Sequence, residues 1–378
     1  MPSDRDQADV PAPQLSDRRR SSSSDQPANG VQRVSDPEAL DEAVERIAAR
    51  HSKQHVGLVV GAVTSAGARS VVPVGRVRAP DGPTPHADTL FEIGSVTKVF
   101  TALLLAEAVT RGELSLDTPL SDLLPEVTVP TRDGAAITVE HLATHTAGLP
   151  NNPLPFSAAI RAQWKARDGD PWDTIDRAAL LTALGEAKLR RTPGTGRIAY
   201  SNFGAGVLGH ALVAATAARD FGELVRSRIC EPLGMTDTVI IPDQEQAERE
   251  AVGHRRRRRT TGHWEVAGLP GAGALRSTAT DMLAFLHAQL RPDDTPLGPA
   301  IALTHPERRP GKRLGIGLGW LRVPMKGDRV MLWHNGGTGG FRAFAGFVPT
   351  AGVGVATLAN DVRSVDRVGL DLLTALST

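Results

Sequence analysis

The sequence predicts an α+β fold, an α/β sandwich in which both ends of the chain supply one antiparallel sheet that helices flank. Two valine-rich runs near the beginning, 56–63 and 71–77, are typical of paired strands. The middle of the chain is mostly helical in pattern, with long loops rich in glycine and proline. Strand-like stretches then return at 315–323, 329–333, 341–348 and 352–359. We therefore expect a helical region inserted into one sheet.

The chain divides into a tail and one folded domain. Residues 1–34 are charged and rich in proline, serine and glutamine, and we expect them to form a disordered tail. The domain is predicted to span 35–375. Its sheet region takes about 35–94 and 310–378, and its helical region takes about 95–309.

The individual elements follow from the spacing of apolar residues. In 37–50 these residues recur at helical spacing, and Pro37 suits the first helical turn. Ser65-Ala66-Gly67 separates the two valine-rich runs as a turn would, and Pro73 places the second run at an edge or a bulge. A further helix begins at Ser95, and others are predicted at 138–144, 175–186, 203–217, 219–230, 278–290 and 363–376.

Composition excludes several classes of function. The 378 residues are 40% hydrophobic and carry a net charge of +1, which gives no argument for a nucleic-acid partner. The single cysteine, Cys230, rules out an internal disulfide and indicates no thiolate metal site, so we expect no metal and no other cofactor. No run is long enough to span a membrane. Serines rather than an apolar stretch follow Arg18-Arg19-Arg20, so we expect a cytoplasmic location.

The first chemical motif is Ser95-Val96-Thr97-Lys98. A serine and a lysine three residues apart lie on the same face of a helix. A lysine kept neutral by burial can take the serine proton, and a helix N-terminus favours developing negative charge. Alone the pattern is weak, because a capping serine followed by a solvated lysine gives the same match.

The second motif is Tyr200-Ser201-Asn202, which contains the only tyrosine of the chain. A phenol near an ammonium group can be held as phenolate, or it can relay a proton between nucleophile and leaving group. The amide of Asn202 can bond both a lysine and a substrate carbonyl. The simpler alternative is a tyrosine packed at the edge of a loop.

The third motif runs from His334 to Phe341 and follows an apolar strand. Its glycines allow a substrate to lie against the strand edge, and backbone N–H groups there can complete an oxyanion hole with that of Ser95. A plain glycine-rich hairpin is the alternative interpretation.

Together, the three motifs in this order resemble the serine β-lactamase and penicillin-binding-protein superfamily, in the branch that holds class C β-lactamases, DD-peptidases and related esterases. That resemblance covers roughly 37–375 and implies a β-lactamase/transpeptidase-like fold. It implies that Ser95 is the acylated nucleophile, that Lys98 is its base or charge partner, and that Tyr200 shuttles protons. The residues it assigns to substrate binding and the oxyanion hole are Asn202, His334, Asn335, Gly336 and Gly337.

The implied activity is acyl transfer through an acyl-Ser95 intermediate, from a small ester, thioester or amide to water or another acceptor. Class C β-lactamases typically have Lys-Thr-Gly at the third motif, where this chain has His334-Asn335-Gly336. A histidine is only partly charged at neutral pH, and an amide replaces the hydroxyl that helps to hold a substrate carboxylate. A cytoplasmic enzyme also does not meet cross-linked peptidoglycan. We therefore favour an esterase or acyltransferase over a D-alanyl-D-alanine carboxypeptidase or β-lactamase, with a non-catalytic acyl- or penicillin-binding module as the alternative of another class.

Three further patterns have a simpler interpretation. The glycines of 204–209 match a dinucleotide-binding motif, but no βαβ pattern surrounds them, so we expect them to allow close helix packing. His141 and His145 are spaced like metal ligands, and we interpret them as structural. Arg255–Arg259 is either a solvated loop or a docking site for a phosphorylated donor such as an acyl carrier or a coenzyme A thioester.

Overall fold

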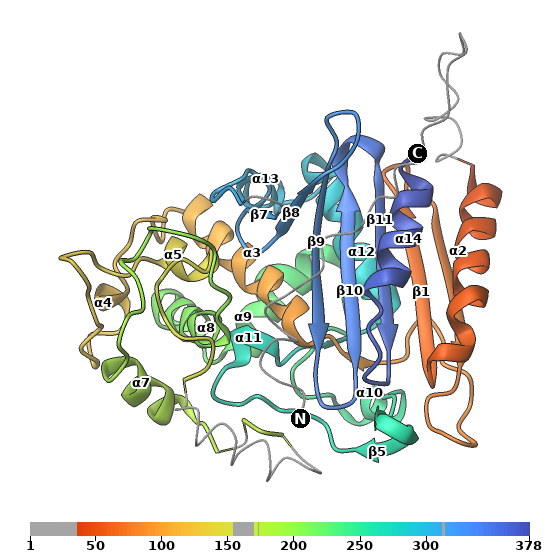
Figure 1. The fold of residues 1–378 in the computed structure, drawn as a ribbon, viewed down its shortest axis with the longest axis horizontal. Coiled ribbons are helices and arrows are strands. Elements are labelled where there is room, and N and C mark those ends of the chain that lie inside the picture. Colours follow the sequence, from red (N-terminus) through yellow and green to blue (C-terminus); the bar gives the residue numbers. More distant parts are fainter. Residues whose placement is uncertain (1–35, 154–169, 173, 312–313) are drawn as a thin grey trace.

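A seven-stranded antiparallel sheet separates two layers of helices (Figure 1). The structure is a computed structural model that describes residues 36–153, 170–172, 174–311 and 314–378. The predicted disordered tail, 1–34, lies outside the described residues. The strand order is β2-β1-β11-β10-β9-β8-β7. The strands are β1 (Gly57–Thr64), β2 (Arg69–Gly75), β7 (Gly315–Ile316), β8 (Leu321–Pro324), β9 (Val330–Gly337), β10 (Arg342–Val348) and β11 (Val353–Ala359).

Both ends of the chain supply this sheet, which confirms the predicted fold class. The pairing of β1 with β11 joins them, with Leu58 opposite Ala359 and Thr64 opposite Val353. Every residue of β1 is buried, because helices cover both faces of the sheet at this position. The valine-rich sequence of β1 therefore reflects burial on two sides.

The single strand predicted at 315–323 is wrong. Two short strands, β7 and β8, stand there instead. Gly319 separates them with φ +74°, and a β-carbon at this position would approach that of Ala102 to 2.7 Å. The backbone bends so that it can pass close to the helix that carries Ala102, and this bend interrupts the strand.

Two helices cover one face of the sheet, α2 (Pro37–His51) and α14 (Asp366–Leu376), and they pack against each other and the strands (Figure 1). Asp36 caps α2 by accepting a hydrogen bond from the backbone N–H of Glu38. On the other face, α12 (Ala279–Leu290) contacts β1, β10 and β11. The remaining helical region lies to one side of the sheet (Figure 1).

The buried helix α3 (Thr97–Thr110) lies at the centre of this region. All but its last two residues are buried, so it shows no polar face. The prediction that the helix begins at Ser95 was wrong by two residues: Gly94–Val96 form a 3₁₀ turn before α3. Gly94 has φ +49°, and a β-carbon there would meet the backbone of Gly337. The close approach of β9 thus sets the shape of this turn.

The other predicted helices fall close to their expected positions, apart from 219–230, where α9 is short and continues into a π-helical turn at Arg226–Cys230. In the described ranges, no helix is long and apolar enough to cross a membrane. The helices with predicted counterparts are α5 (Val139–Ala143), α7 (Arg177–Gly185), α8 (Asn202–Thr216) and α9 (Phe221–Val225). Among the described residues, four further short helices were not predicted: α4 (Leu120–Leu123), α10 (Gln244–Glu248), α11 (Pro270–Gly273) and α13 (Gly298–Thr304).

Candidate active site

The structure brings the first two motifs into direct contact. Ser95 stands in the 3₁₀ turn, and Lys98 lies in the first turn of α3. The Ser95 Oγ atom lies 3.0 Å from Lys98 Nζ and accepts a hydrogen bond of 2.7 Å from the Tyr200 hydroxyl. Tyr200 comes from the segment just before α8, more than a hundred residues along the chain. The serine hydroxyl therefore lies between a lysine amine and a phenol.

Lys98 is buried, with 3% of its surface exposed, and burial holds the pKa of its amine well below the usual value of 10.5. Its Nζ donates to Asn202 Oδ1 at 2.9 Å and to the Ala272 carbonyl at 2.6 Å. A neutral amine has two N–H donors and one lone pair. In the neutral form that burial favours, the two acceptors use both donors, which leaves the lone pair for the proton of Ser95. This is the arrangement of a base next to its nucleophile.

Asn202 is the first residue of α8, and Ser201 caps that helix by accepting the N–H of Gly204 at 2.9 Å. The Asn202 amide nitrogen donates to Asn151 Oδ1 at 3.3 Å and to Asn152 Oδ1 at 3.4 Å. These two contacts fix the orientation of the amide, so its oxygen faces Lys98. Sequence reasoning missed Asn151, Asn152 and Ala272; only the two adjacent asparagines could have been noticed.

His145 supports the segment that carries Tyr200. The Ala199 N–H donates to the His145 carbonyl at 2.9 Å, the Ser201 N–H donates to the His145 ring at 3.3 Å, and the rings of His145 and Tyr200 lie 4.7 Å apart. Burial raises the pKa of the Tyr200 phenol above its usual value, although its hydrogen bond to Ser95 opposes this shift. The phenol is therefore protonated at neutral pH, which favours the proton relay over the phenolate.

His334 lies on β9 with 1% of its surface exposed. Burial is the main cause that lowers its pKa to about 3. Its Nδ1 lies 2.6 Å from the Asn335 carbonyl, and its buried Nε2 has no hydrogen-bond partner in the described part of the chain. The expected partial charge of His334 at neutral pH is therefore wrong: the imidazole is neutral, because its burial disfavours the charged form.

Asn335 does not face Ser95. Its amide donates to Asp366 Oδ2 at 3.0 Å, at the first residue of α14, on the opposite face of the sheet. Side chains alternate along a strand, so the residue after the inward-facing His334 points outward. The assignment of the Asn335 side chain to substrate binding beside Ser95 is therefore corrected.

Gly336 and Gly337 bring the end of β9 against the Ser95 turn. A β-carbon on Gly336 would lie 1.9 Å from the Ile93 carbonyl oxygen and 2.9 Å from the Ser95 nitrogen. A β-carbon on Gly94 would lie 2.6 Å from the Gly337 nitrogen. Only residues without side chains allow this backbone contact, which places the two proposed oxyanion-hole residues, Ser95 and Gly337, next to each other.

Two side chains that sequence reasoning missed stand beside the glycine-rich end of β9. The Arg342 guanidinium lies over Gly337, where a β-carbon would approach Nη1 to 2.9 Å, and it donates to the carbonyls of Thr338 and Phe341 at 2.9 and 2.7 Å. The Trp264 indole lies over Gly339, where a β-carbon would approach Nε1 to 2.6 Å. Neither residue has a sequence signal of its own.

The glycines of 204–209 and the two histidines, His141 and His145, have structural roles. A β-carbon on Gly206 would lie 2.9 Å from that of Leu269, and one on Gly209 would lie 3.1 Å from the Gly271 α-carbon, so these glycines let α8 pack closely against α11 and the residue preceding it. The His141 ring accepts the Thr138 N–H in a capping box, and His145 supports Tyr200. In the part of the chain that is described, no group of three or more His, Cys, Asp or Glu side chains could hold a metal ion.

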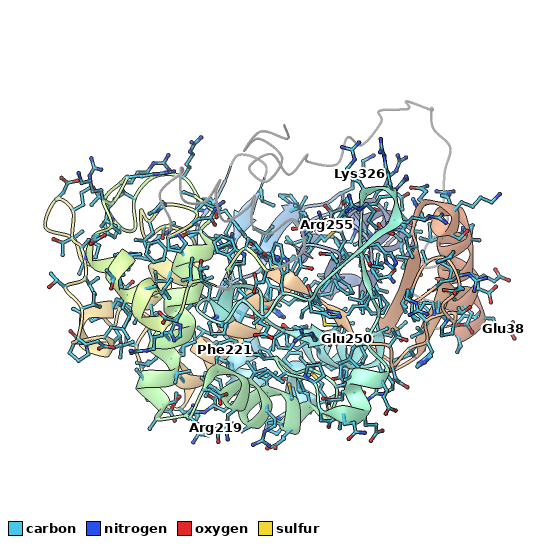
Figure 2. All side chains as sticks on the ribbon, turned by 90° about the horizontal axis from the view of Figure 1, so that it is seen from below. Glu38, Arg219, Phe221, Glu250, Arg255 and Lys326 are labelled. Atoms are coloured by element: carbon cyan, nitrogen blue, oxygen red, sulfur yellow. The ribbon has the colours of Figure 1, made fainter. Side chains whose placement is uncertain are left out.

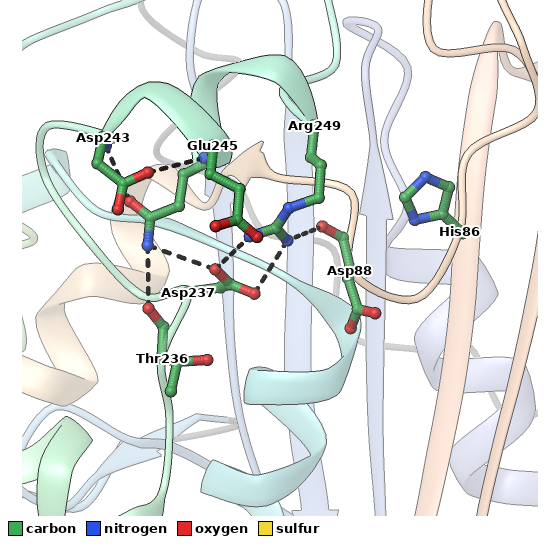
Figure 3. Close-up of a pocket in the computed structure, with 8 residues that line it drawn as sticks. His86, Asp88, Thr236, Asp237, Asp243, Glu245 and Arg249 are labelled. Carbon is green, nitrogen blue, oxygen red and sulfur yellow. Dashed lines mark hydrogen bonds and ion pairs between the residues drawn. The ribbon is translucent and has the colours of Figure 1, made fainter.

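A cavity of about 490 Å³ lies apart from these residues (Figure 3). Its lining is acidic, and several of its polar side chains already have partners. Arg249 donates two hydrogen bonds to Asp237 at 3.0 and 2.6 Å, and Asp243 caps α10. It contains none of the predicted site residues, and we assign it no role. Its lining residues are His86, Asp88, Thr236, Asp237, Asp243, Glu245, Gln246 and Arg249.

Comparison with known proteins places this geometry in context. The family model described as Beta-lactamase matches residues 40–377. The chain is 29% identical over 347 residues to the D-alanyl-D-alanine-carboxypeptidase/endopeptidase AmpH of Escherichia coli K12, covering 86% of this chain and 85% of AmpH. It is 28% identical to a beta-lactamase of Pseudomonas fluorescens, covering 72% of this chain and 80% of that protein. It is 35% identical over 167 residues to the esterase EstB of Burkholderia gladioli, covering 44% and 41% of the two chains.

Proposed function

Because this chain belongs to the Beta-lactamase family, we propose that it is an esterase or acyltransferase that acts on a small ester, thioester or amide through an acyl-Ser95 intermediate. The observation that carries this proposal is the environment of Lys98. Its amine is buried, and both of its N–H donors have acceptors in Asn202 and Ala272, so its lone pair is available to Ser95.

The proposed first step transfers the acyl group to the enzyme. Lys98 takes the proton of Ser95, and Oγ attacks the carbonyl carbon of the substrate. The backbone N–H groups of Ser95 and Gly337 stabilise the oxyanion. As the bond to the leaving group breaks, Tyr200 gives its proton to the leaving atom and regains one from the Lys98 ammonium. The products are the Ser95 ester and a protonated leaving group.

The second step runs the same relay in reverse. Water or another acceptor gives its proton to the site and attacks the Ser95 ester, and the proton finally returns to Ser95 Oγ. Water yields a carboxylic acid, whereas an alcohol or amine yields a new ester or amide.

The third motif supports an esterase or acyltransferase over an enzyme that recognises a carboxylate of its substrate. A neutral His334 offers that carboxylate no positive charge, and Asn335 turns away to Asp366. Neither side chain therefore supplies the contact that Lys-Thr-Gly provides in class C β-lactamases. Similarity to the esterase EstB agrees with this preference over part of the chain.

Arg342 favours a second candidate, a D-alanyl-D-alanine carboxypeptidase or β-lactamase. Its half-buried guanidinium lies over Gly337 and is held there by two carbonyl groups, so it offers a positive charge near the end of β9. The relative AmpH, which covers most of the chain, carries the carboxypeptidase name.

Paired substrates separate these candidates. We expect the enzyme to hydrolyse p-nitrophenyl butyrate much faster than a peptide ending in D-alanyl-D-alanine, and Ser95→Ala to lose both activities. Faster hydrolysis of the peptide would favour the carboxypeptidase if two changes abolish it: replacement of the C-terminal carboxylate of the peptide by an amide, and Arg342→Gln in the protein. A stoichiometric acyl adduct without turnover would instead favour the non-catalytic binding module.

A further inference from the structure

The arginine run forms an exposed hairpin. It spans β4 (Gly253–Arg255), a 3₁₀ turn (Arg256–Arg258) and β5 (Arg259–Thr261), which we call the arginine hairpin. Arg256 to Arg259 are all exposed. In the described ranges, none of these four makes a salt bridge. Exposed arginines elsewhere, such as Arg219 and Arg291, pair with aspartates at 2.8 and 2.9 Å.

The tip of the hairpin keeps arginine at unfavourable positions. Arg257 and Arg258 have φ +62° and +57°, values at which glycine or asparagine is easier to accommodate. A loop that only had to be solvated would gain from either of those residues. Backbone strain of this kind is concentrated at functional sites. The charge of these side chains is therefore a better explanation of their presence than the geometry of the turn.

The arginine hairpin packs against the loop between β9 and β10, next to the candidate active site. The His254 N–H donates to the Gly340 carbonyl at 3.2 Å, and β-carbons on Gly340 would collide with Gly253 and Thr261. The chain then passes Trp264, which lies over Gly339, and reaches Ala272, whose carbonyl accepts from Lys98. The chain from Gly337 to Gly340 spans at most ~10 Å when extended, and the chain from Gly253 to the tip of the hairpin spans at most ~13 Å. The arginines therefore lie within roughly 25 Å of Gly337.

We propose that the arginine hairpin binds the phosphate groups of an acyl thioester whose acyl group is transferred to Ser95. This inference rests on the proposed function of Ser95. The chemical class is a thioester of a phosphate-bearing thiol, of which acyl-coenzyme A is the available probe. Ser95 Oγ forms the new bond to the acyl carbon, and the carbon–sulfur bond breaks. Tyr200 protonates the thiol that leaves, and the proton of Ser95 replaces that of Tyr200 by way of Lys98.

The chemistry of both partners fits. A guanidinium makes two parallel hydrogen bonds to a phosphate, and adjacent arginines can hold adjacent phosphates. The histidine of the third motif does not compete for the anionic part of the substrate, because His334 is neutral. A long thiol arm separates the phosphates of such a donor from its thioester, so the phosphates can lie on a rim while the acyl group reaches Ser95.

The test compares two thioesters of the same acyl group, butyryl-coenzyme A and S-butyryl-N-acetylcysteamine, which has no phosphates. The hairpin variant carries Arg256→Gln, Arg257→Gln, Arg258→Gln and Arg259→Gln. The distal variant carries Arg219→Gln, Arg226→Gln, Arg291→Gln and Arg367→Gln, so it loses the same charge elsewhere on the surface. Figure 2 shows how far Arg219 lies from Arg255 at the hairpin. Thiol release gives kcat/KM for each substrate.

We expect the wild-type protein and the distal variant to prefer butyryl-coenzyme A by about tenfold or more, through KM, and this preference to weaken between about 0.05 M and about 0.5 M NaCl. The hairpin variant should lose the preference while its kcat/KM for the phosphate-free thioester stays unchanged.

Equal kcat/KM for the two thioesters in the wild-type protein would overturn the inference, as would equal behaviour of the hairpin and distal variants. A third outcome would also overturn it: no preference for butyryl-coenzyme A over the phosphate-free thioester, but turnover of a butyryl-acyl carrier protein that depends on the hairpin. The hairpin would then bind the surface of a carrier protein. Undiminished turnover of both thioesters by Ser95→Ala would reject the proposed function instead.

Discussion

The backbone nitrogen of Ser95 lies so close to Gly336 that a β-carbon added to the glycine would approach it to 2.9 Å. The same β-carbon would lie 1.9 Å from the carbonyl oxygen of Ile93, the residue just before the 3₁₀ turn. A separation of that size forces either β9 or the Ser95 turn to move. The position of the proposed nucleophile is therefore coupled to the last residues of β9.

We expect Gly336→Ala to lower kcat/KM for p-nitrophenyl butyrate by about a hundredfold or more, the size of effect seen when one oxyanion donor is lost. The reason is displacement of the Ser95 or Gly337 N–H. Gly273→Ala is the matched control, because a β-carbon there finds its nearest contact at 3.6 Å, an ordinary distance to the Gly94 backbone. Equal activity of the two folded variants would contradict the coupling.

Removal of the phenol tests the proton relay. Tyr200→Phe keeps the ring that packs against His145 but loses the hydroxyl that donates to Ser95. We expect kcat to fall by at least about a hundredfold, as loss of a general acid or base can cause, with the thermal unfolding midpoint nearly unchanged. A variant that keeps most of its kcat would exclude this role of Tyr200.

The burial of Lys98 predicts a pH dependence. The amine is active as a base only when neutral, and burial lowers its pKa well below 10.5. Activity should therefore be lost as pH falls through this lowered pKa and should reach a plateau well before pH 10.5. Lys98→Arg should be nearly inactive at every pH, because a guanidinium stays protonated. A kcat/KM profile that rises only near the ordinary lysine pKa would show that Lys98 is charged in the free enzyme.

The orientation of Asn335 predicts a structural role. Asn335→Ala removes the hydrogen bond to Asp366 and should lower the free energy of unfolding by about 1 kcal/mol, with little change in kcat/KM. Denaturant unfolding and ester hydrolysis measure the two effects separately. A loss of more than about tenfold in kcat/KM at unchanged stability would return the Asn335 side chain to the substrate site.

The fold could be predicted from the sequence where the apolar pattern alone decides it. The valine-rich runs at both ends of the chain indicated the sheet, and their burial in β1 and β11 explains the pattern. The pattern failed at Gly319 and at the Ser95 turn, because contacts with distant segments set the backbone there. The division of the domain at residues 95 and 309 stays a prediction.

The candidate site could be predicted where residue type carries the chemistry. Ser95, Lys98, Tyr200 and Asn202 could be selected in this way, and the structure places them in contact. The Ala272 carbonyl could not be selected, because every residue has one. The charge of His334 depends on its burial, which residue type does not reveal. The outward orientation of Asn335 follows from strand alternation once His334 is known to face inward.

The most direct measurement is the mass of the peptide that contains Ser95 after brief incubation with a fluorophosphonate or p-nitrophenyl butyrate. We predict one adduct, located on Ser95, that is absent from Ser95→Ala and reduced in Lys98→Arg. The same Ser95→Ala protein should not hydrolyse the ester. An unmodified Ser95 peptide, together with equal ester turnover by wild type and Ser95→Ala, would contradict the acyl-Ser95 mechanism.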